Sequence, residues 1–404
     1  MSTPAEDEFT RAMPDEIVVA SQHADRVVRT IGPDLTGVKE TSDLLGLSRV
    51  VLTDVAAAQA RFEDVVAAAV KARRIGRPTG PLEAVMAGVR LTSADRWDGW
   101  MPRMGKNRVM LGGESQAITV PRADGDPVGG ITEADLPAAR PGGAGVLVGM
   151  LDTPVRRDLA LDGRLLPESS RMDRTDTAMP LQGHGTFTAG LVHQQAADAD
   201  IVVRGVLAGR EGNATAWEVA VALLDLVRDY RERGLAVVNM SLGCFTEDNR
   251  PPLVLETAVG MVRDDVVLVA AGGNHGRRSP GTVPSPVAPM WPAALDGVVA
   301  VGGRIPAGDD VEPAPFTPRA PWLNLLADGT DVASTYVSGK VSVAETVEQF
   351  DGAARWSGGS MAAANAAGRL AALSHGLGGV RGALGRILAG DQVDPALSVF
   401  HPPL

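Results

Sequence analysis

Continuous apolar runs alternate with helical patterns along the second half of the chain. A run such as VLVGMLD contains almost no polar residue, as expected of a strand covered on both faces of a sheet. Between residues 214 and 233, apolar side chains recur at helical spacing. Strands that alternate with helices predict a mostly parallel sheet with right-handed crossovers. The predicted strands lie at 146–152, 201–207, 235–243, 266–274 and 297–303.

The N-terminal part of the chain has a shorter alternating pattern. DEIVVA and LSRVVLTD are typical of strands, and apolar residues at helical spacing follow each of them. This β-α-β-α-β order predicts a small α/β domain over residues 1–110. The predicted strands lie at 15–20, 47–54 and 87–92, and the predicted helices at 22–31 and 55–74.

A segment rich in glycine and proline separates the two patterns. Ten of the 25 residues from 121 to 145 are Gly or Pro, which is typical either of a linker or of an ordered surface loop. Both interpretations stay open. We place the linker at 111–130 and the second domain at 131–404.

Composition limits the classes of partner. The chain has 404 residues, 45% of them hydrophobic, and a net charge of −11. Two domains are therefore expected, and nucleic acid is disfavoured as a partner because phosphate binding needs clustered cations. Aromatic and basic residues do mix at 96–108, but packing between domains explains this segment better in so acidic a chain.

The chain shows no sign of export or membrane insertion. Its acidic N-terminus lacks the apolar core of a signal peptide, and no run of about 18 apolar residues occurs. Cys244 is the single cysteine, so an intrachain disulfide is impossible. We expect a cytoplasmic protein without membrane contact, in which Cys244 is a packing residue.

Polar residues with chemical potential lie at strand ends and helix starts. Asp152, Ser241 and Asn274 each end or follow a predicted strand, at the edge of a parallel sheet where ligands bind. His184 stands between two glycines before a predicted helix, and Ser360 follows two glycines and opens a helix of small residues. His193 and His275 are interpreted as loop or helix-surface residues.

These residues fit the parts of a nucleophilic site. A serine hydroxyl needs a base, usually a histidine that a buried carboxylate orients. Ser360, His184 and Asp152 match these three roles, and the Asn274 amide with the N-terminus of the Ser360 helix could stabilise an oxyanion. Each residue also has an ordinary alternative: a capping aspartate, a loop histidine, a turn asparagine and a helix N-cap serine.

Several motifs in this order resemble the subtilisin-like serine protease family. They are VLVGMLDTPV, GHGTFTAGLV, NMSLG, VAAGGNHG and GGSMAAANAAG, and the resemblance extends over about 131–373. It implies a subtilisin-like three-layer fold around a mostly parallel central sheet. It also implies a serine endopeptidase that hydrolyses peptide bonds through an acyl-enzyme, with peptides or proteins as partners. The α/β-hydrolase alternative does not fit, because WSGGSMA is not a G-x-S-x-G motif.

The chain departs from the usual family pattern at four positions. Gly359 replaces the usual threonine, Ala364 the usual proline, Asn365 a common histidine, and Pro154 an expected glycine. None of these changes removes a catalytic atom. Gly359 weakens oxyanion stabilisation if a threonine hydroxyl assists there, and the others concern loop geometry. A non-catalytic peptide-binding relative is therefore the alternative function.

The resemblance also extends to substrate contacts, metals and the N-terminal domain. It implies that two edges line the substrate groove, and it allows for calcium, although no carboxylate cluster assigns a site and no cofactor is expected. The domain at 1–110 is then either a propeptide-like inhibitor and folding aid or a recruitment domain. The implied groove residues are Ser241, Leu242, Gly243, Gly272 and Gly273.

Overall fold

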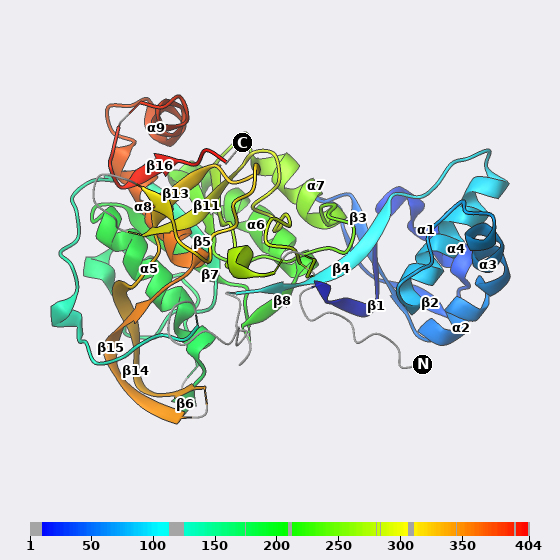
Figure 1. Ribbon diagram of the computed structural model, residues 1–404, viewed down its shortest axis with the longest axis horizontal. Coiled ribbons are helices and arrows are strands. Elements are labelled where there is room, and N and C mark those ends of the chain that lie inside the picture. The colour runs from blue at the N-terminus through cyan, green and yellow to red at the C-terminus, as the bar shows by residue number, and fades with distance from the viewer. Residues whose placement is uncertain are drawn as a thin grey trace.

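The computed structural model describes two units that lie side by side (Figure 1). The N-terminal unit comprises residues 10–112, and the larger unit begins at residue 125. Residues 113–124 of the predicted linker lie outside the described residues. Only the two ends of this linker, 111–112 and 125–130, are therefore described. The described ranges are 10–112, 125–173, 175–208, 212–279, 281–282, 284–305, 311–344, 346–391 and 393–402.

A mostly parallel sheet forms the centre of the larger unit, as the sequence predicted. Its strand order is β16-β13-β11-β10-β9-β5-β7, and β12 pairs with β11. The apolar runs form the central strands because both faces of the sheet are covered, and every residue of β5 is buried. The strands are β5 (Leu147–Asp152), β7 (Asp200–Gly205), β9 (Leu235–Met240), β10 (Val267–Ala271), β11 (Val298–Ile305), β12 (Glu312–Pro313), β13 (Leu325–Asp328) and β16 (Leu397–Val399).

Helices cover both faces of this sheet and make three layers. One core joins the sheet to α5 (His184–Gln195), α8 (Gly359–Leu373) and α9 (Gly379–Leu388). A second core joins the opposite face to α6 (Ala216–Tyr230) and α7 (Leu253–Val262). The α/β three-layer prediction is therefore confirmed.

Small residues bring α8 close to the sheet and to α5. Except for Ala372, the alanines of α8 are completely buried, and Gly368 lies so near α5 that a methyl group there would be 2.6 Å from the carbonyl oxygen of Val192. A long hairpin of β14 (Val332–Val343) and β15 (Thr346–Trp356), with the short β6 (Thr177–Ala178) alongside, leads into α8. This packing fixes the start of α8 beside the carboxyl ends of the central strands.

The N-terminal unit is built on an antiparallel sheet of order β2-β3-β1-β4-β8. Its fifth strand, β8 (Asn213–Thr215), belongs to the larger unit. Helices cover one face of the sheet, and α6 and α7 of the larger unit cover the other. The elements are β1 (Ala12–Ala20), α1 (Ser21–Ile31), β2 (Thr36–Ser42), β3 (Leu47–Leu52), α2 (Val55–Ala60), α3 (Glu63–Lys71), α4 (Pro81–Arg96) and β4 (Met104–Leu111).

Three details of the N-terminal prediction were wrong. The expected strand at 87–92 lies inside α4, which begins with Pro81 at its first turn, a position that suits proline. The expected helix at 55–74 is two helices, because the chain bends at Phe62 to bury that side chain against Gly88. Strands β2 and β4 were not predicted, since both are rich in polar and charged residues.

Candidate active site

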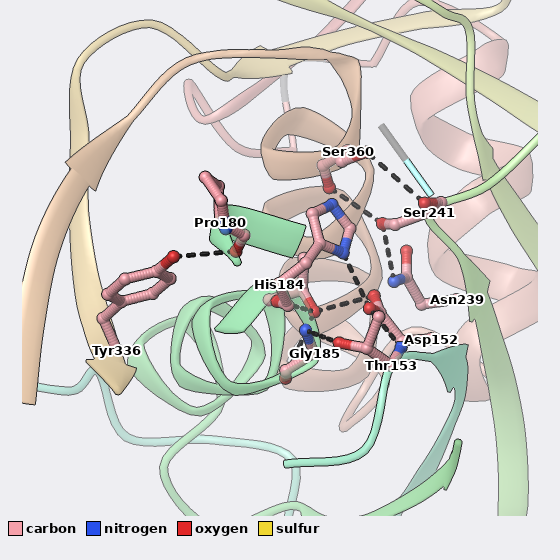
Figure 2. Close-up of polar contacts among 10 residues, drawn as sticks. Asp152, Thr153, Pro180, His184, Gly185, Asn239, Ser241, Tyr336 and Ser360 are labelled. Atoms are coloured by element: carbon pink, nitrogen blue, oxygen red, sulfur yellow. Dashed lines mark hydrogen bonds and ion pairs between the residues drawn. The ribbon is translucent and has the colours of Figure 1, made fainter. Parts of the chain in front are cut away.

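A buried aspartate and histidine form a hydrogen-bonded pair at the end of β5 (Figure 2). Asp152 and His184 are 0% and 1% exposed, and Asp152 Oδ1 lies 2.7 Å from His184 Nδ1. The same oxygen accepts from the Thr153 backbone N–H at 2.7 Å, and Oδ2 accepts from Thr188 Oγ1 at 2.9 Å. These bonds fix the carboxylate and direct the imidazole, while the buried Nε2 of His184 has no hydrogen-bond partner.

The two glycines beside His184 allow close approach of neighbouring segments. A methyl group on Gly183 would lie 2.2 Å from the Tyr336 ring, and one on Gly185 would lie 2.0 Å from the carbonyl oxygen of Thr153. The Gly185 N–H also donates to Thr153 Oγ1 at 2.7 Å. Side chains at either position would push His184 away from Asp152, which explains the GHG pattern.

Ser360 lies in the first turn of α8, next to the imidazole of His184 in Figure 2, and its hydroxyl is directed toward the Ser241 carbonyl oxygen. Gly358 is the N-cap of this helix, so the N-cap alternative for Ser360 was wrong. Ser241 Oγ accepts from Asn239 Nδ2 at 3.0 Å and donates to the carbonyl oxygen of Ser360 at 2.9 Å. The Ser360 hydroxyl makes only a long contact of 3.4 Å with the Ser241 carbonyl oxygen.

Asn274 follows β10 and contacts the start of α8. Its Oδ1 accepts the Gly359 backbone N–H at 2.7 Å. Because a backbone N–H can only donate, this bond turns the amide NH2 group of Asn274 away from it and leaves that donor for another partner. A methyl group on Gly359 would lie 3.1 Å from the Gly273 carbonyl oxygen, so the unusual glycine permits this tight contact.

The predicted groove residues play different parts. Ser241 and Leu242 are buried, and the Gly272 N–H donates to the Val301 carbonyl at 2.8 Å, which extends the central sheet. The Gly273 backbone lies beside the start of α8, where a methyl group on Gly359 would be 3.1 Å from its carbonyl oxygen, and the Gly243 backbone pairs with Leu111.

The edge at Gly243 is already paired with the end of β4. Leu111 and Gly243 exchange two backbone hydrogen bonds, of 2.9 and 3.0 Å. On the other side, β4 pairs antiparallel with β8, and the Gly112 N–H donates to the Gly212 carbonyl at 3.2 Å. The end of the N-terminal unit therefore lies as an extended strand between two edges of the larger unit.

A cluster of nearly buried charges holds β4 against the larger unit. Lys106 and Arg108 of β4 are 8% and 7% exposed, and both pair with Glu247 of the larger unit. Lys106 also pairs with Glu83 of α4. Burial alone would raise the pKa of Glu247, but hydrogen bonds and charges from Arg108 and Lys106 outweigh it and lower the pKa to about 2.

Other residues singled out in the sequence lie outside this constellation. His275 is fully buried, which corrects its surface interpretation; burial lowers its pKa to about 4. His193 is also buried and pairs with Asp162 at 3.0 Å. Burial raises the pKa of the Cys244 thiol to about 12, in keeping with a packing role. Sequence reasoning missed Thr188, although its place one helical turn after His184 was a signal.

The described residues offer no metal site and no membrane span. Across the described ranges, no group of three or more His, Cys, Asp or Glu side chains is arranged to hold a metal ion. No described helix is both long and apolar enough to cross a membrane.

Two known proteins are similar to this chain over much of its length. A thermophilic serine proteinase from Bacillus sp. (strain AK1) is 28% identical over 247 residues, which are 58% of this chain and 53% of that protein. The chain thus spans about half the length of this relative. Fervidolysin from Fervidobacterium pennivorans, a keratinolytic enzyme related to subtilisin, has a TM-score of 0.58 and 15% identity over 90% of this chain and 55% of that chain. That second likeness concerns the fold alone.

A match to the model of a protein family shows to which family this chain belongs. The model of the subtilase family matches residues 143–379, which is more than half of the 404 residues. The matched segment includes Asp152, His184, Asn274 and Ser360, the residues that meet at the carboxyl ends of the central strands. With the three-layer fold and this match together, the chain belongs to the subtilase family.

Proposed function

We propose that this chain is a serine endopeptidase that cleaves peptide bonds through an acyl-enzyme on Ser360. One observation carries the proposal: the buried Asp152–His184 hydrogen bond leaves His184 Nε2 without a partner, and Ser360 lies next to that ring. A base held in one orientation beside a hydroxyl is what activates a serine nucleophile.

In the proposed reaction, His184 Nε2 takes the Ser360 proton as Oγ attacks the substrate carbonyl carbon. Asp152 stabilises the resulting imidazolium, which then gives its proton to the leaving amine as the C–N bond breaks. An ester to Ser360 remains. His184 next removes a proton from water, which attacks the ester and releases the acid, and the proton returns to Ser360.

The oxyanion is stabilised by donors around the start of α8. The amide oxygen of Asn274 accepts a hydrogen bond from the Gly359 N–H at 2.7 Å. Its NH2 group is therefore available to donate to the negative oxygen. The first N–H groups of α8 have no partner within the helix and carry its positive dipole end. Such prepositioned donors are the largest single contribution in many acyl transfers.

Serine labelling and two substitutions test the assignment. Ser360→Ala is expected to lower kcat by roughly 10⁶-fold, and His184→Ala by a similar factor. A fluorophosphonate should label Ser360 in the wild-type chain, as mass spectrometry of the labelled peptide would reveal. Near-normal peptidase activity in Ser360→Ala would refute the role of this serine.

A non-catalytic peptide-binding module is the alternative function. Its support is the Ser360 hydroxyl, which contacts the Ser241 carbonyl at 3.4 Å instead of bonding to His184. A module of this kind would bind extended peptides at the Gly243 edge. It would give no fluorophosphonate adduct and no hydrolysis, whereas the peptidase gives both.

The N-terminal unit is part of the proposal as an intramolecular inhibitor. The pairing of Leu111 with Gly243 supports this role, because a peptide substrate would need the same backbone groups. The competing role is recruitment of a client or regulator. If the N-terminal unit is an inhibitor, weakening its contacts with the larger unit raises the peptidase activity. If it is a recruitment domain, the same change leaves the hydrolysis of short peptides unchanged.

A further inference from the structure

A methionine side chain fills the space between two glycine-containing segments beside Ser360. A methyl group on Gly243 would lie 2.2 Å from Met290 Cε and 2.8 Å from Cγ, and a methyl group on Gly273 would lie 2.6 Å from Met290 Sδ. Met290 is only 6% exposed. Its side chain therefore occupies the gap that the Cα atoms of both glycines face.

This gap borders the proposed nucleophile on two sides. The segment of Gly243 includes Ser241, whose carbonyl oxygen lies 3.4 Å from Ser360 Oγ. The segment of Gly273 includes Asn274, which is bonded at 2.7 Å to the residue before Ser360. Because both segments contact Ser360 or the residue before it, a substrate residue whose carbonyl carbon lies at Ser360 Oγ has its side chain beside this gap.

The backbone around Met290 is anchored. The Met290 carbonyl accepts from the Ala294 N–H at 2.9 Å, and Trp291 exchanges two backbone hydrogen bonds of 2.9 Å with Cys244. Met290 also belongs to a small apolar cluster with Phe245 and Ala288. The side chain thus projects into the gap from a fixed backbone, although the thioether chain itself has three rotatable bonds.

We propose that Met290 is a specificity-determining residue that restricts the attacked substrate residue to glycine or alanine. The inference rests on the proposed peptidase function. A large side chain such as phenylalanine has to displace Met290 from its apolar contacts before its carbonyl can reach Ser360. One methylene group more or less in an apolar pocket changes selectivity by roughly 10- to 200-fold, so closure by a whole methionine side chain should have a measurable effect on selectivity.

Single-residue esters test this pocket in the intact chain. N-acetyl-glycine, N-acetyl-alanine and N-acetyl-phenylalanine p-nitrophenyl esters need the space beside Ser360 but not the Gly243 edge that β4 occupies. We expect kcat/KM to favour the glycine and alanine esters in the wild type. For each protein we take the ratio of kcat/KM for the phenylalanine ester to kcat/KM for the glycine ester. This ratio should be at least tenfold higher in Met290→Ala than in the wild type. Comparing the two proteins in this way cancels the intrinsic reactivities of the esters.

Matched variants separate pocket size from general damage. Met290→Leu conserves volume and should keep the wild-type ratio. Met261→Ala removes an exposed methionine of α7, 41% exposed, and should leave the ratio unchanged. If Met290→Ala is not labelled by fluorophosphonate, Met290→Val serves in its place, because it still removes the Sδ and Cε atoms that face the glycines.

The outcomes distinguish this inference from the function on which it rests. A Ser360 that reacts with fluorophosphonate in every variant, with an unchanged ester ratio in Met290→Ala or Met290→Val, overturns the inference alone. Equal acceptance of glycine and phenylalanine by the wild type does the same, since it means that Met290 moves aside freely. A wild-type chain with neither labelling nor ester hydrolysis overturns the peptidase proposal and this inference together.

Discussion

Glu247→Gln tests how the N-terminal unit is held on the larger unit. Glu247 belongs to the larger unit, so the change leaves the sequence of the N-terminal unit intact. It removes the one carboxylate that Lys106 and Arg108 of β4 share. Lys106 keeps its pair with Glu83, and Arg108 keeps its hydrogen bond to the Thr10 carbonyl at 2.8 Å.

The size of the effect follows from burial. Exposed ion pairs are worth about 0–1 kcal/mol, whereas breaking a buried pair costs about 3–5 kcal/mol. Lys106 and Arg108 are nearly buried, but the Glu247 side chain is 34% exposed and glutamine can still accept one hydrogen bond. We therefore expect docking to weaken by about 1–3 kcal/mol, or roughly 5- to 150-fold in its equilibrium constant.

Hydrogen exchange measures this docking without catalysis. In a Ser360→Ala background, which cannot process itself, the Leu111 and Gly243 amides should exchange roughly 5- to 150-fold faster in Glu247→Gln. Arg103→Gln is the matched control. Its pair with Glu256, at 3.1 Å, is 57% and 51% exposed, so exchange should change less than about fivefold. Unchanged exchange in Glu247→Gln, or an equal effect in the control, would refute this account of the contact.

Two further predictions concern the residues that follow β10. Asn274→Ala and Asn274→Asp should each lower kcat by at least roughly 10² to 10³, or about 2.7–4 kcal/mol, the range for an oxyanion donor in subtilisin. The aspartate keeps an acceptor for the Gly359 N–H, so a raised KM with normal kcat would assign Asn274 to substrate binding instead. Burial lowers the pKa of His275 from 6.5 to about 4, so the neutral form is favoured in the folded state. The free energy of unfolding should therefore be unaffected by His275 above pH 6.5 and should fall by roughly 3 kcal/mol as the pH drops to about 4. Urea unfolding should show this loss in the wild type but not in His275→Gln. Equal losses in both proteins would contradict the prediction.

The central sheet could be predicted from the sequence because burial on both faces leaves a local trace. A strand such as β5 consists of one apolar run with a polar residue at its end, and no distant information is needed to find it. The four residues of the site were also predicted, since Asp152, His184, Asn274 and Ser360 each stand beside glycines or at element ends. Their roles stay proposals until the substitutions are made.

Strand β4 and the Met290 contacts could not be predicted in this way. The charges of β4 suggest a solvent-exposed segment until Glu83 and Glu247, far away in sequence, are brought beside Lys106 and Arg108. The position of Met290 between two glycines depends on three segments that meet only in the folded chain. Such pairings are set by tertiary structure and leave no periodic pattern.

The sharing of one sheet between the two units makes their separation hard to reverse. Strand β4 has β1 on one side and β8 of the larger unit on the other. When the units part, β4 becomes an open edge with unpaired backbone groups, and the buried Met110 loses its cover. Edges of this kind tend to pair with other chains. We therefore expect a separated N-terminal unit to be lost to such pairing, so that its release would be a one-time event.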